Sequence, residues 1–157
     1  MKFQNKAFVR WDDLDAMGHV NNAKYLTLAQ EARFEWSFRQ HHARGEKPGL
    51  LDMVVARAEV DFLEAIFEGG IYVDVELWVS RIGNASFDMV YEIKNGSVLT
   101  ARVKTVQVAV DESGNIISLE NKLKSNVAAI NLSLTDLYTN AAIQSGAITS
   151  LDSLKAP

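Results

Sequence analysis

The chain has 157 residues, enough for one domain with one hydrophobic core, and 48% of them are apolar, as in a packed globular protein. A formal net charge of -4 gives no basic surface for nucleic acid or an anionic membrane. The absence of cysteine excludes disulfides, a thiolate nucleophile and cysteine-bound metals, and fits a reducing cytoplasm. Because no apolar run reaches the length of a signal peptide or a membrane span, we expect a cytoplasmic protein without membrane insertion.

The first third of the chain predicts a strand followed by a long helix. Residues 3–11 read as a strand, and the acidic, glycine-containing segment 12–18 is typical of a turn. Asn21 or Asn22 then offers an N-cap for a helix over residues 25–39. Apolar residues recur through this helix at helical spacing and extend beyond one stripe, which predicts that it is mostly buried.

After residue 50 the apolar period changes from that of a helix to that of strands. Four strands are expected, over residues 56–67, 71–79, 87–93 and 99–110. Short turn sequences separate them, and Asn95-Gly96 is the strongest hairpin signal among these. The predicted order is therefore a strand, a helix, and four strands in a meander.

A single buried helix needs a sheet to cover it, which predicts an α+β protein with an antiparallel sheet wrapped around one long central helix. We expect this domain to occupy residues 1–130 and to close with a short helix over residues 119–130. Residues 131–157 form a C-terminal extension in which no chemistry is evident.

Side chains able to do chemistry are concentrated between the first strand and the helix, over residues 10–25. The first turn of a helix carries unpaired backbone N–H groups and a partial positive charge, so it can hold a developing oxyanion. A carboxylate a few residues upstream would face the same point. Together, the two groups are sufficient to hydrolyse an activated acyl group.

The residues at this junction resemble a known family signature. The stretch Arg10-Trp11-x-Asp13-x-Asp15-x-x-Gly18-His19-Val20-Asn21-Asn22-x-x-Tyr25, with Glu31-Ala32-Arg33 in the helix, is similar to the 4-hydroxybenzoyl-CoA thioesterase-like branch of the hotdog superfamily. The resemblance is strong over the motif, and by element order it extends over roughly residues 3–125. The fold of that family is a helix wrapped by an antiparallel sheet.

The resemblance implies hydrolysis of a thioester carried by CoA or by an acyl carrier protein, without a metal or organic cofactor. It assigns Asp15 as general base or nucleophile and the backbone N–H of Asn22 as oxyanion donor. Some members carry a histidine at the position of Asn22, and an asparagine there cannot take a proton. The resemblance also implies a homodimer or homotetramer with the site at a subunit boundary.

Four further residues, Gly18, His19, Val20 and Tyr25, are predicted to contact substrate. Structural alternatives stand beside these roles. Asp15 could form an Asx-turn or an N-cap, His19 could make a fixed turn hydrogen bond, and Tyr25 could belong to the core.

Other polar residues are expected to be structural. Asp12 and Asp13 suit turn or capping positions, and His41 and His42 suit a helix end better than a metal site. Basic residues on the strands could meet CoA phosphates, although solvated strand-edge charges are the default interpretation. These residues are Arg81, Lys94, Arg102 and Lys104.

Two other functions fit the same fold. A non-catalytic acyl-binding protein would use the pocket only to hold a ligand, and the combination of Asp15, Gly18 and Asn22 argues against it. A hotdog dehydratase or hydratase would need an acid/base histidine, typically in Asp-x-Asn-Pro-x-His, and this string does not occur.

Overall fold

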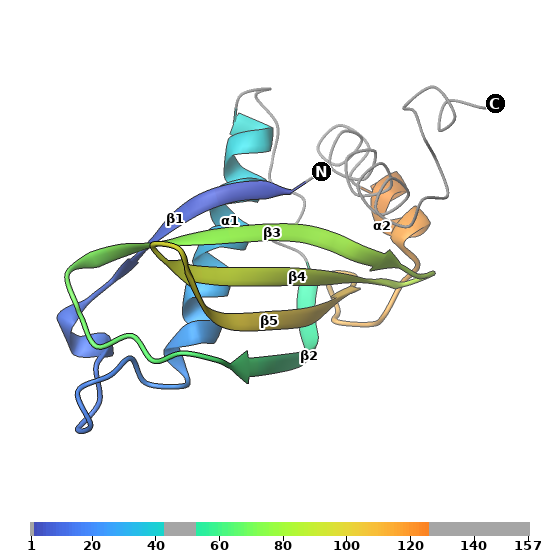
Figure 1. Ribbon diagram of the computed structural model, residues 1–157. Helices are drawn as coiled ribbons and strands as arrows, with labels where there is room; N and C mark the ends of the chain where they lie inside the picture. The colour runs from blue at the N-terminus through green and yellow to red at the C-terminus, as the bar shows by residue number, and fades with distance from the viewer. Residues whose placement is uncertain (1, 43–52, 126–157) are drawn as a thin grey trace.

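The computed structural model describes residues 2–42 and 53–125. Its five strands form one antiparallel sheet in the order β1-β3-β4-β5-β2, with the long helix α1 crossing behind it (Figure 1). This confirms the predicted α+β class and the sheet wrapped around one long helix. The elements are β1 (Phe3–Val9), the 3-10 helix η1 (Trp11–Asp13), α1 (Lys24–His42), β2 (Met53–Phe62), β3 (Ile71–Ile82), β4 (Ser86–Asn95), β5 (Val98–Ala109) and α2 (Leu119–Ser125).

The core lies between α1 and the inner face of the sheet. Alternate residues of β3 and β4 point inward, as the period of two in the sequence predicts. Small residues of α1, Ala29 and Ala32, are buried at the contact and let the helix approach the sheet closely. The inward apolar residues of these two strands are Val73, Val75, Leu77, Val79, Phe87, Met89, Tyr91 and Ile93.

The prediction that α1 is mostly buried is wrong for one side of the helix. The sheet covers the side of α1 that faces the core (Figure 1). Leu26 and Phe38, which the sheet does not cover, are 39% and 46% exposed. The apolar surface that extended beyond one stripe in the sequence is therefore solvent-exposed in the single chain.

The predicted four-strand meander is also wrong in one respect, because β2 does not pair with β3. Only β3, β4 and β5 follow one another as neighbours, whereas β2 pairs with β5 at the far edge of the sheet. Both edges of β3 are already occupied, by β1 and β4, so β2 joins the free edge of β5. The hairpin predicted at Asn95-Gly96 is confirmed between β4 and β5, with Gly96 at a φ of 60°.

Strand β2 ends at Phe62, five residues before the predicted end of its strand at Phe67. The backbone N–H groups of Leu63 and Glu64 both donate to the carbonyl oxygen of Thr100, at 2.9 and 3.0 Å. These two bonds turn the chain away from the line of the strand. Residues 63–70 then cross from the β2 edge toward β3 and pass beside the start of α1, where Val20 N–H donates to Ile66 O at 2.8 Å.

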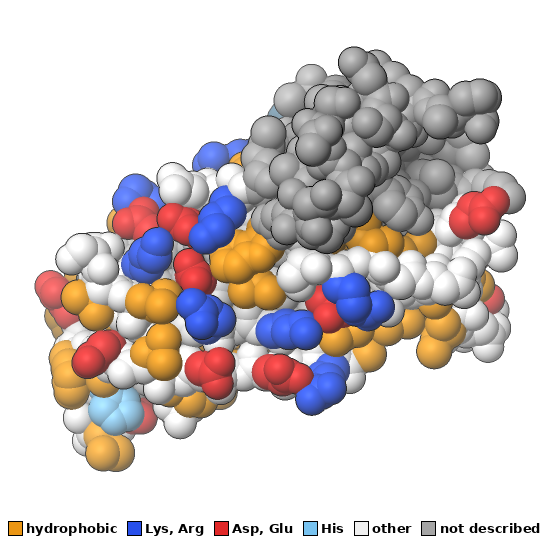
Figure 2. All heavy atoms as spheres, turned by 45° about the vertical axis from the view of Figure 1, so that its right-hand side comes forward, with side chains coloured by type: hydrophobic (Ala, Val, Ile, Leu, Met, Phe, Trp, Pro, Cys, Tyr) orange, Lys and Arg blue, Asp and Glu red, His pale blue; other side chains and the backbone are white. Residues whose placement is uncertain are grey.

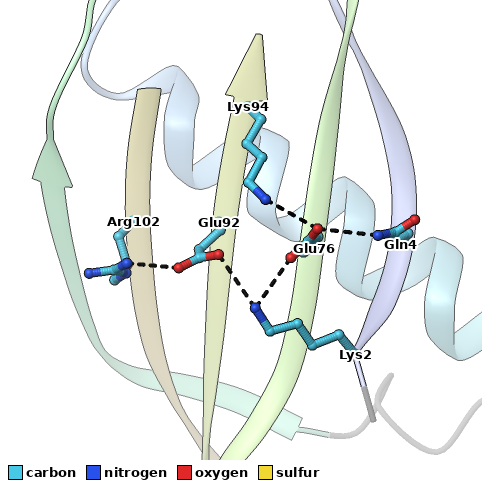
Figure 3. Close-up of polar contacts among 6 residues, drawn as sticks. All are labelled: Lys2, Gln4, Glu76, Glu92, Lys94 and Arg102. Carbon is cyan, nitrogen blue, oxygen red and sulfur yellow. Dashed lines mark hydrogen bonds and ion pairs between the residues drawn. The ribbon is translucent and has the colours of Figure 1, made fainter. Parts of the chain in front are cut away.

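The outer face of the sheet carries an ion-pair network across four strands (Figure 3). Glu76 on β3 accepts from Lys94 on β4 and Gln4 on β1, both at 3.2 Å, and lies 3.3 Å from the Lys2 ammonium. Lys2 also reaches Glu92 on β4, which accepts from Arg102 on β5 at 2.7 Å. Basic and acidic side chains accordingly lie next to one another on this face (Figure 2).

The C-terminal part of the described chain is the helix α2, which lies inside the predicted segment 119–130. Residues 126–130 and the extension 131–157 lie outside the described residues. Within the described ranges, no helix is both long and apolar enough to span a bilayer.

Candidate active site

The segment between β1 and α1 is a closed loop built by its own hydrogen bonds. An isolated bridge pairs Leu14 with Val20, and Asp15 N–H donates to His19 O at 2.9 Å. Gly18 closes the tip by donating to Asp15 O at 3.0 Å. Its φ of 78° is unfavourable for other residues, and nothing lies within 4 Å of the place where a Cβ would be. Gly18 is therefore needed for its backbone conformation, since no described part of the protein packs closely against it.

Asp13 anchors this loop from inside the protein. Its carboxylate accepts from Arg10 N–H at 2.8 Å and from the Arg10 guanidinium at 3.0 Å, and Lys24 lies 3.3 Å away. Burial raises the pKa of Asp13, but the hydrogen bonds from Arg10 and Lys24 outweigh it and hold the pKa below its usual value. Asp13 thus has the structural role predicted from its position in the turn.

The helix start leaves one backbone donor unused. Asn21 Oδ1 accepts from Ala23 N–H at 2.9 Å, so Asn21 is the N-cap, one of the two residues that the sequence offered. Asn21 N–H itself donates to Asp13 O at 2.9 Å. Among the residues that the structure describes, Asn22 N–H donates to none, which leaves it available in the turn that leads into α1.

The Asp15 side chain lies on the outer part of the loop and is 25% exposed. Oδ1 accepts from Met17 N–H at 2.9 Å, which is the Asx-turn that the sequence allowed as a structural role. Oδ2 lies 3.5 Å from His19 Nδ1. Within residues 2–42 and 53–125, no lysine or arginine forms an ion pair with Asp15.

A small cavity of about 130 Å³ lies against the helix start. Four residues predicted to be at the site line it, namely His19, Val20, Asn22 and Tyr25. Asp15 and Gly18 do not line it, and Asp15 reaches it only through its contact with His19. The structure therefore brings the predicted residues together around one loop, with the carboxylate beside the cavity.

Tyr25 takes both positions that the sequence allowed, since it is buried and also lines the cavity. Its ring packs edge-on against Phe62, with ring centroids 5.3 Å apart. Burial raises the pKa of the phenol, while a backbone hydrogen bond from Ile66 acts in the opposite direction. The phenol is therefore neutral at physiological pH.

The remaining wall of the cavity comes from a segment that the sequence did not indicate, Phe62, Leu63, Glu64 and Ala65. Glu64 has no hydrogen-bond or ion-pair partner for its carboxylate in the described part of the chain. The sequence placed Glu64 inside the predicted strand 56–67, so its position gave no signal of a site. No spacing connected it to the motif, which lies much earlier in the chain.

A larger cavity of about 650 Å³ lies elsewhere, between the edge of β1 and α1. Charged residues line much of it, including Arg10, Asp13, Lys24 and Glu31, and most of them are ion-paired with one another. None of the six predicted site residues reaches it. Size therefore does not locate the chemistry here, and the smaller cavity beside Asp15 is the better candidate.

The other candidate residues lie away from the loop. Arg33 of the helix motif is buried and donates to Tyr91 OH at 3.2 Å. The four strand cations are in ion pairs on the outer face, with Asp88, Glu76 or Glu92. They lie on the inner strands β3, β4 and β5, and not at a sheet edge as the default interpretation expected. In the described ranges, no group of three or more His, Cys, Asp or Glu residues could hold a metal ion.

Comparison with known proteins identifies the class to which this fold and loop belong. The family model of the thioesterase-like superfamily matches residues 9–130, and the chain belongs to this superfamily. A 1,4-dihydroxy-2-naphthoyl-CoA hydrolase of Nostoc punctiforme is 31% identical over 117 residues, covering 72% of this chain and 77% of the relative.

Two solved structures show the same fold. A thioesterase of Thermus thermophilus complexed with coenzyme A and Zn is 29% identical, with a TM-score of 0.64, covering 80% of this chain and 97% of that one. A DHNA-CoA thioesterase of Staphylococcus aureus has a TM-score of 0.70 and covers 94% of this chain and 97% of that one. Its 18% identity supports the fold alone.

Proposed function

We propose that this protein is an acyl-CoA thioesterase that uses Asp15 as its catalytic carboxylate. The observation that carries the proposal is the loop geometry. Asp15, which has no lysine or arginine partner among the described residues, lies beside the small cavity. The wall of this cavity includes Asn22, whose backbone N–H is unused at the helix start. Membership of the thioesterase-like superfamily and the CoA-linked names of two similar proteins support the same activity.

The proposed reaction is hydrolysis of the thioester. Asp15 accepts a proton from water as the water oxygen bonds to the carbonyl carbon, and the Asn22 N–H stabilises the resulting oxyanion. The C–S bond then breaks, and the proton held by Asp15 passes to the departing thiolate. The alternative is attack by Asp15 itself, giving an anhydride that water hydrolyses. The thioester is already activated, so neither route requires a metal or an organic cofactor.

The proposed substrate contacts are those of the small cavity. His19, Val20 and Tyr25 line it and would contact the substrate near the thioester, while Gly18 fixes the loop that presents them. We also propose action in the cytoplasm, since a chain without cysteine suits a reducing compartment.

The activity is tested by measuring free thiol release from a panel of acyl-CoAs with a thiol-reactive dye. The panel should include short, long and aromatic acyl groups, each also assayed after heat denaturation of the protein as a matched blank. We expect enzyme-dependent release from at least one member. Specific binding of acyl-CoAs without release from any of them would instead support a non-catalytic acyl-binding protein.

We further propose a homodimer or homotetramer in which the free edge of β2 is paired. Strand β2 is exposed along most of its length, and Val54 and Val55 are 47% and 45% exposed. At the opposite edge of the sheet, on β1, Lys6 N–H donates to the side-chain oxygen Oδ1 of the preceding residue, Asn5, at 2.8 Å. This N–H is therefore not available to pair with another strand. An open edge next to exposed apolar residues is the side expected to associate.

Light scattering tests this assembly. We expect a mass of at least twice the 17.4 kDa of one chain at micromolar concentration. Val55→Lys should shift the protein toward the single chain, because it places charge at the proposed contact. Val98→Lys, an equally exposed site at the β4–β5 hairpin, serves as the control and should leave the mass unchanged. A wild-type mass near 17.4 kDa would contradict the proposal.

A further inference from the structure

The Asp15 carboxylate faces one other side chain among the described residues, the imidazole of His19. Nδ1 of that ring lies 3.5 Å from Asp15 Oδ2 and 3.4 Å from the carbonyl oxygen of Val20. At neutral pH a carboxylate and a carbonyl oxygen can only accept hydrogen bonds. A lone pair on Nδ1 would be repelled by both oxygens, whereas a proton there is attracted by both. The contacts therefore favour a hydrogen on Nδ1.

The ring is held in this position by its surroundings. It meets the ring of Phe67 in a T-shaped contact, with centroids 5.9 Å apart and an interplanar angle of 83°. The backbone of His19 is fixed as well, because His19 O accepts from Asp15 N–H at 2.9 Å. The side chain is only 22% exposed. Asp15 contacts the ring, and Glu64 is the acidic residue that lines the same cavity.

We propose that His19 is a positioning residue for Asp15. Rotation about the last bond of an aspartate is broad, and the Met17 N–H fixes only Oδ1. The Nδ1–H of His19, 3.5 Å from Oδ2, attracts this second oxygen and thereby restrains the plane of the carboxylate. The inference rests on the proposed function of Asp15, and it replaces substrate contact as the principal role of His19.

Two substitutions separate this role from substrate contact. The amide nitrogen of Asn can take the place of Nδ1, whereas the amide of the longer Gln reaches the place of Nε2. For the acyl-CoA with the highest wild-type turnover, His19→Asn should lower kcat by clearly less than His19→Gln does, because only Asn keeps a donor at the place of Nδ1. His19→Gln should lower kcat by about 10- to 100-fold with KM nearly unchanged, because misplacing a reacting group by about 1 Å has effects of that size.

A double-mutant cycle provides the control. In an Asp15→Asn background, His19→Gln should cause little further loss, since the carboxylate that His19 positions is already gone. Fully additive losses would overturn the proposal, as would a rise in KM with unchanged kcat in His19→Gln. The reverse order, with Gln active and Asn impaired, would assign the role to Nε2 and overturn it as well.

A measurement on the wild-type protein avoids dependence on the folding of any variant. Nitrogen-15 NMR of the labelled histidines at neutral pH, assigned by His19→Asn, should show His19 protonated at Nδ1. The Nε2–H tautomer would overturn the inference. Because this measurement needs no substrate, it tests His19 separately. Absence of thiol release from every acyl-CoA would contradict the proposed function instead.

Discussion

The outer face of the sheet and the surroundings of the small cavity both carry acidic side chains, but in the described ranges only the acids on the sheet are paired with lysine or arginine. On the sheet, Glu76 and Glu92 are each in contact with two basic residues. In the loop, Asp15 faces only a histidine, and Glu64 across the cavity has no charged partner among the described residues. Acidic groups that stabilise this fold are paired, and the group proposed for chemistry is left available to act on a ligand.

The same contrast recurs within the loop, between aspartates two positions apart. Asp13 is buried and paired with Arg10 and Lys24, whereas the side chain of Asp15 is one-quarter exposed. The loop therefore contains one structural carboxylate, Asp13, which stabilises the loop conformation, and a second, Asp15, which that conformation leaves accessible. Substitutions of the paired acids should change stability, and substitution of the unpaired acid should change turnover.

The largest effect on stability is expected at Asp13. Asp13→Asn keeps the size of the side chain but removes the charge that Arg10 and Lys24 contact, which should lower the free energy of unfolding by about 2 kcal/mol. Urea denaturation measures this, and turnover per folded molecule should stay within about fivefold of wild type, a barrier change of about 1 kcal/mol. Unchanged stability with abolished turnover would reverse the roles assigned to the two aspartates.

A smaller effect is expected in the outer network, and it depends on pH. Hydrogen bonding from Lys94 lowers the pKa of Glu76 below its usual 4.5, although burial acts in the opposite direction and Lys2 reinforces the lowering. A carboxylate with a lowered pKa in the folded state stabilises the protein fully above its unfolded value, and this stabilisation is lost as the pH falls through the folded value.

Glu76→Gln should therefore reduce stability by up to about 1 kcal/mol near pH 7 and have little effect below both pKa values. Thermal melting between pH 7 and pH 2 measures the difference. If the difference in melting temperature between wild type and Glu76→Gln increased as the pH fell, the proposed contribution of the Glu76 ion pairs to stability would be contradicted.

The smallest effect is expected at Asp12, whose side chain is 73% exposed and lies 3.4 Å from Arg10. Asp12→Asn should change the free energy of unfolding by no more than about 0.5 kcal/mol. Turnover should stay within about twofold. The variant thus provides a matched Asp-to-Asn control in the same loop, and a large loss of either property would show that the charge of the whole loop matters.

Local sequence patterns predicted much of this molecule. The period of β3 and β4, the turn at Asn95-Gly96 and the capping asparagine before α1 depend on neighbouring residues, and all are found. The loop over residues 10–22 could be recognised because its residues are consecutive. Its internal bonds, such as Met17 N–H to Asp15, also join near neighbours.

Features that depend on distant pairing could not be predicted in the same way. Strand β2 pairs with β5 because that edge of the sheet remains free. The sequence of β2 does not indicate which strand it pairs with. Glu64 reaches the cavity because Thr100 holds its backbone, 36 positions further along the chain. The full cavity wall therefore required the structure, while the loop that carries Asp15 did not.

The most direct test of the account is the rate of thiol release by Asp15→Asn. Asparagine can still form the Asx-turn with Met17 but cannot accept a proton from water or attack as a carboxylate. We expect kcat to fall by about 10²- to 10⁴-fold, the usual contribution of general-base catalysis, with unchanged melting and retained ligand binding. If Asp15→Asn, Asp12→Asn and wild type release thiol at rates within about fivefold of one another, Asp15 is not the catalytic carboxylate.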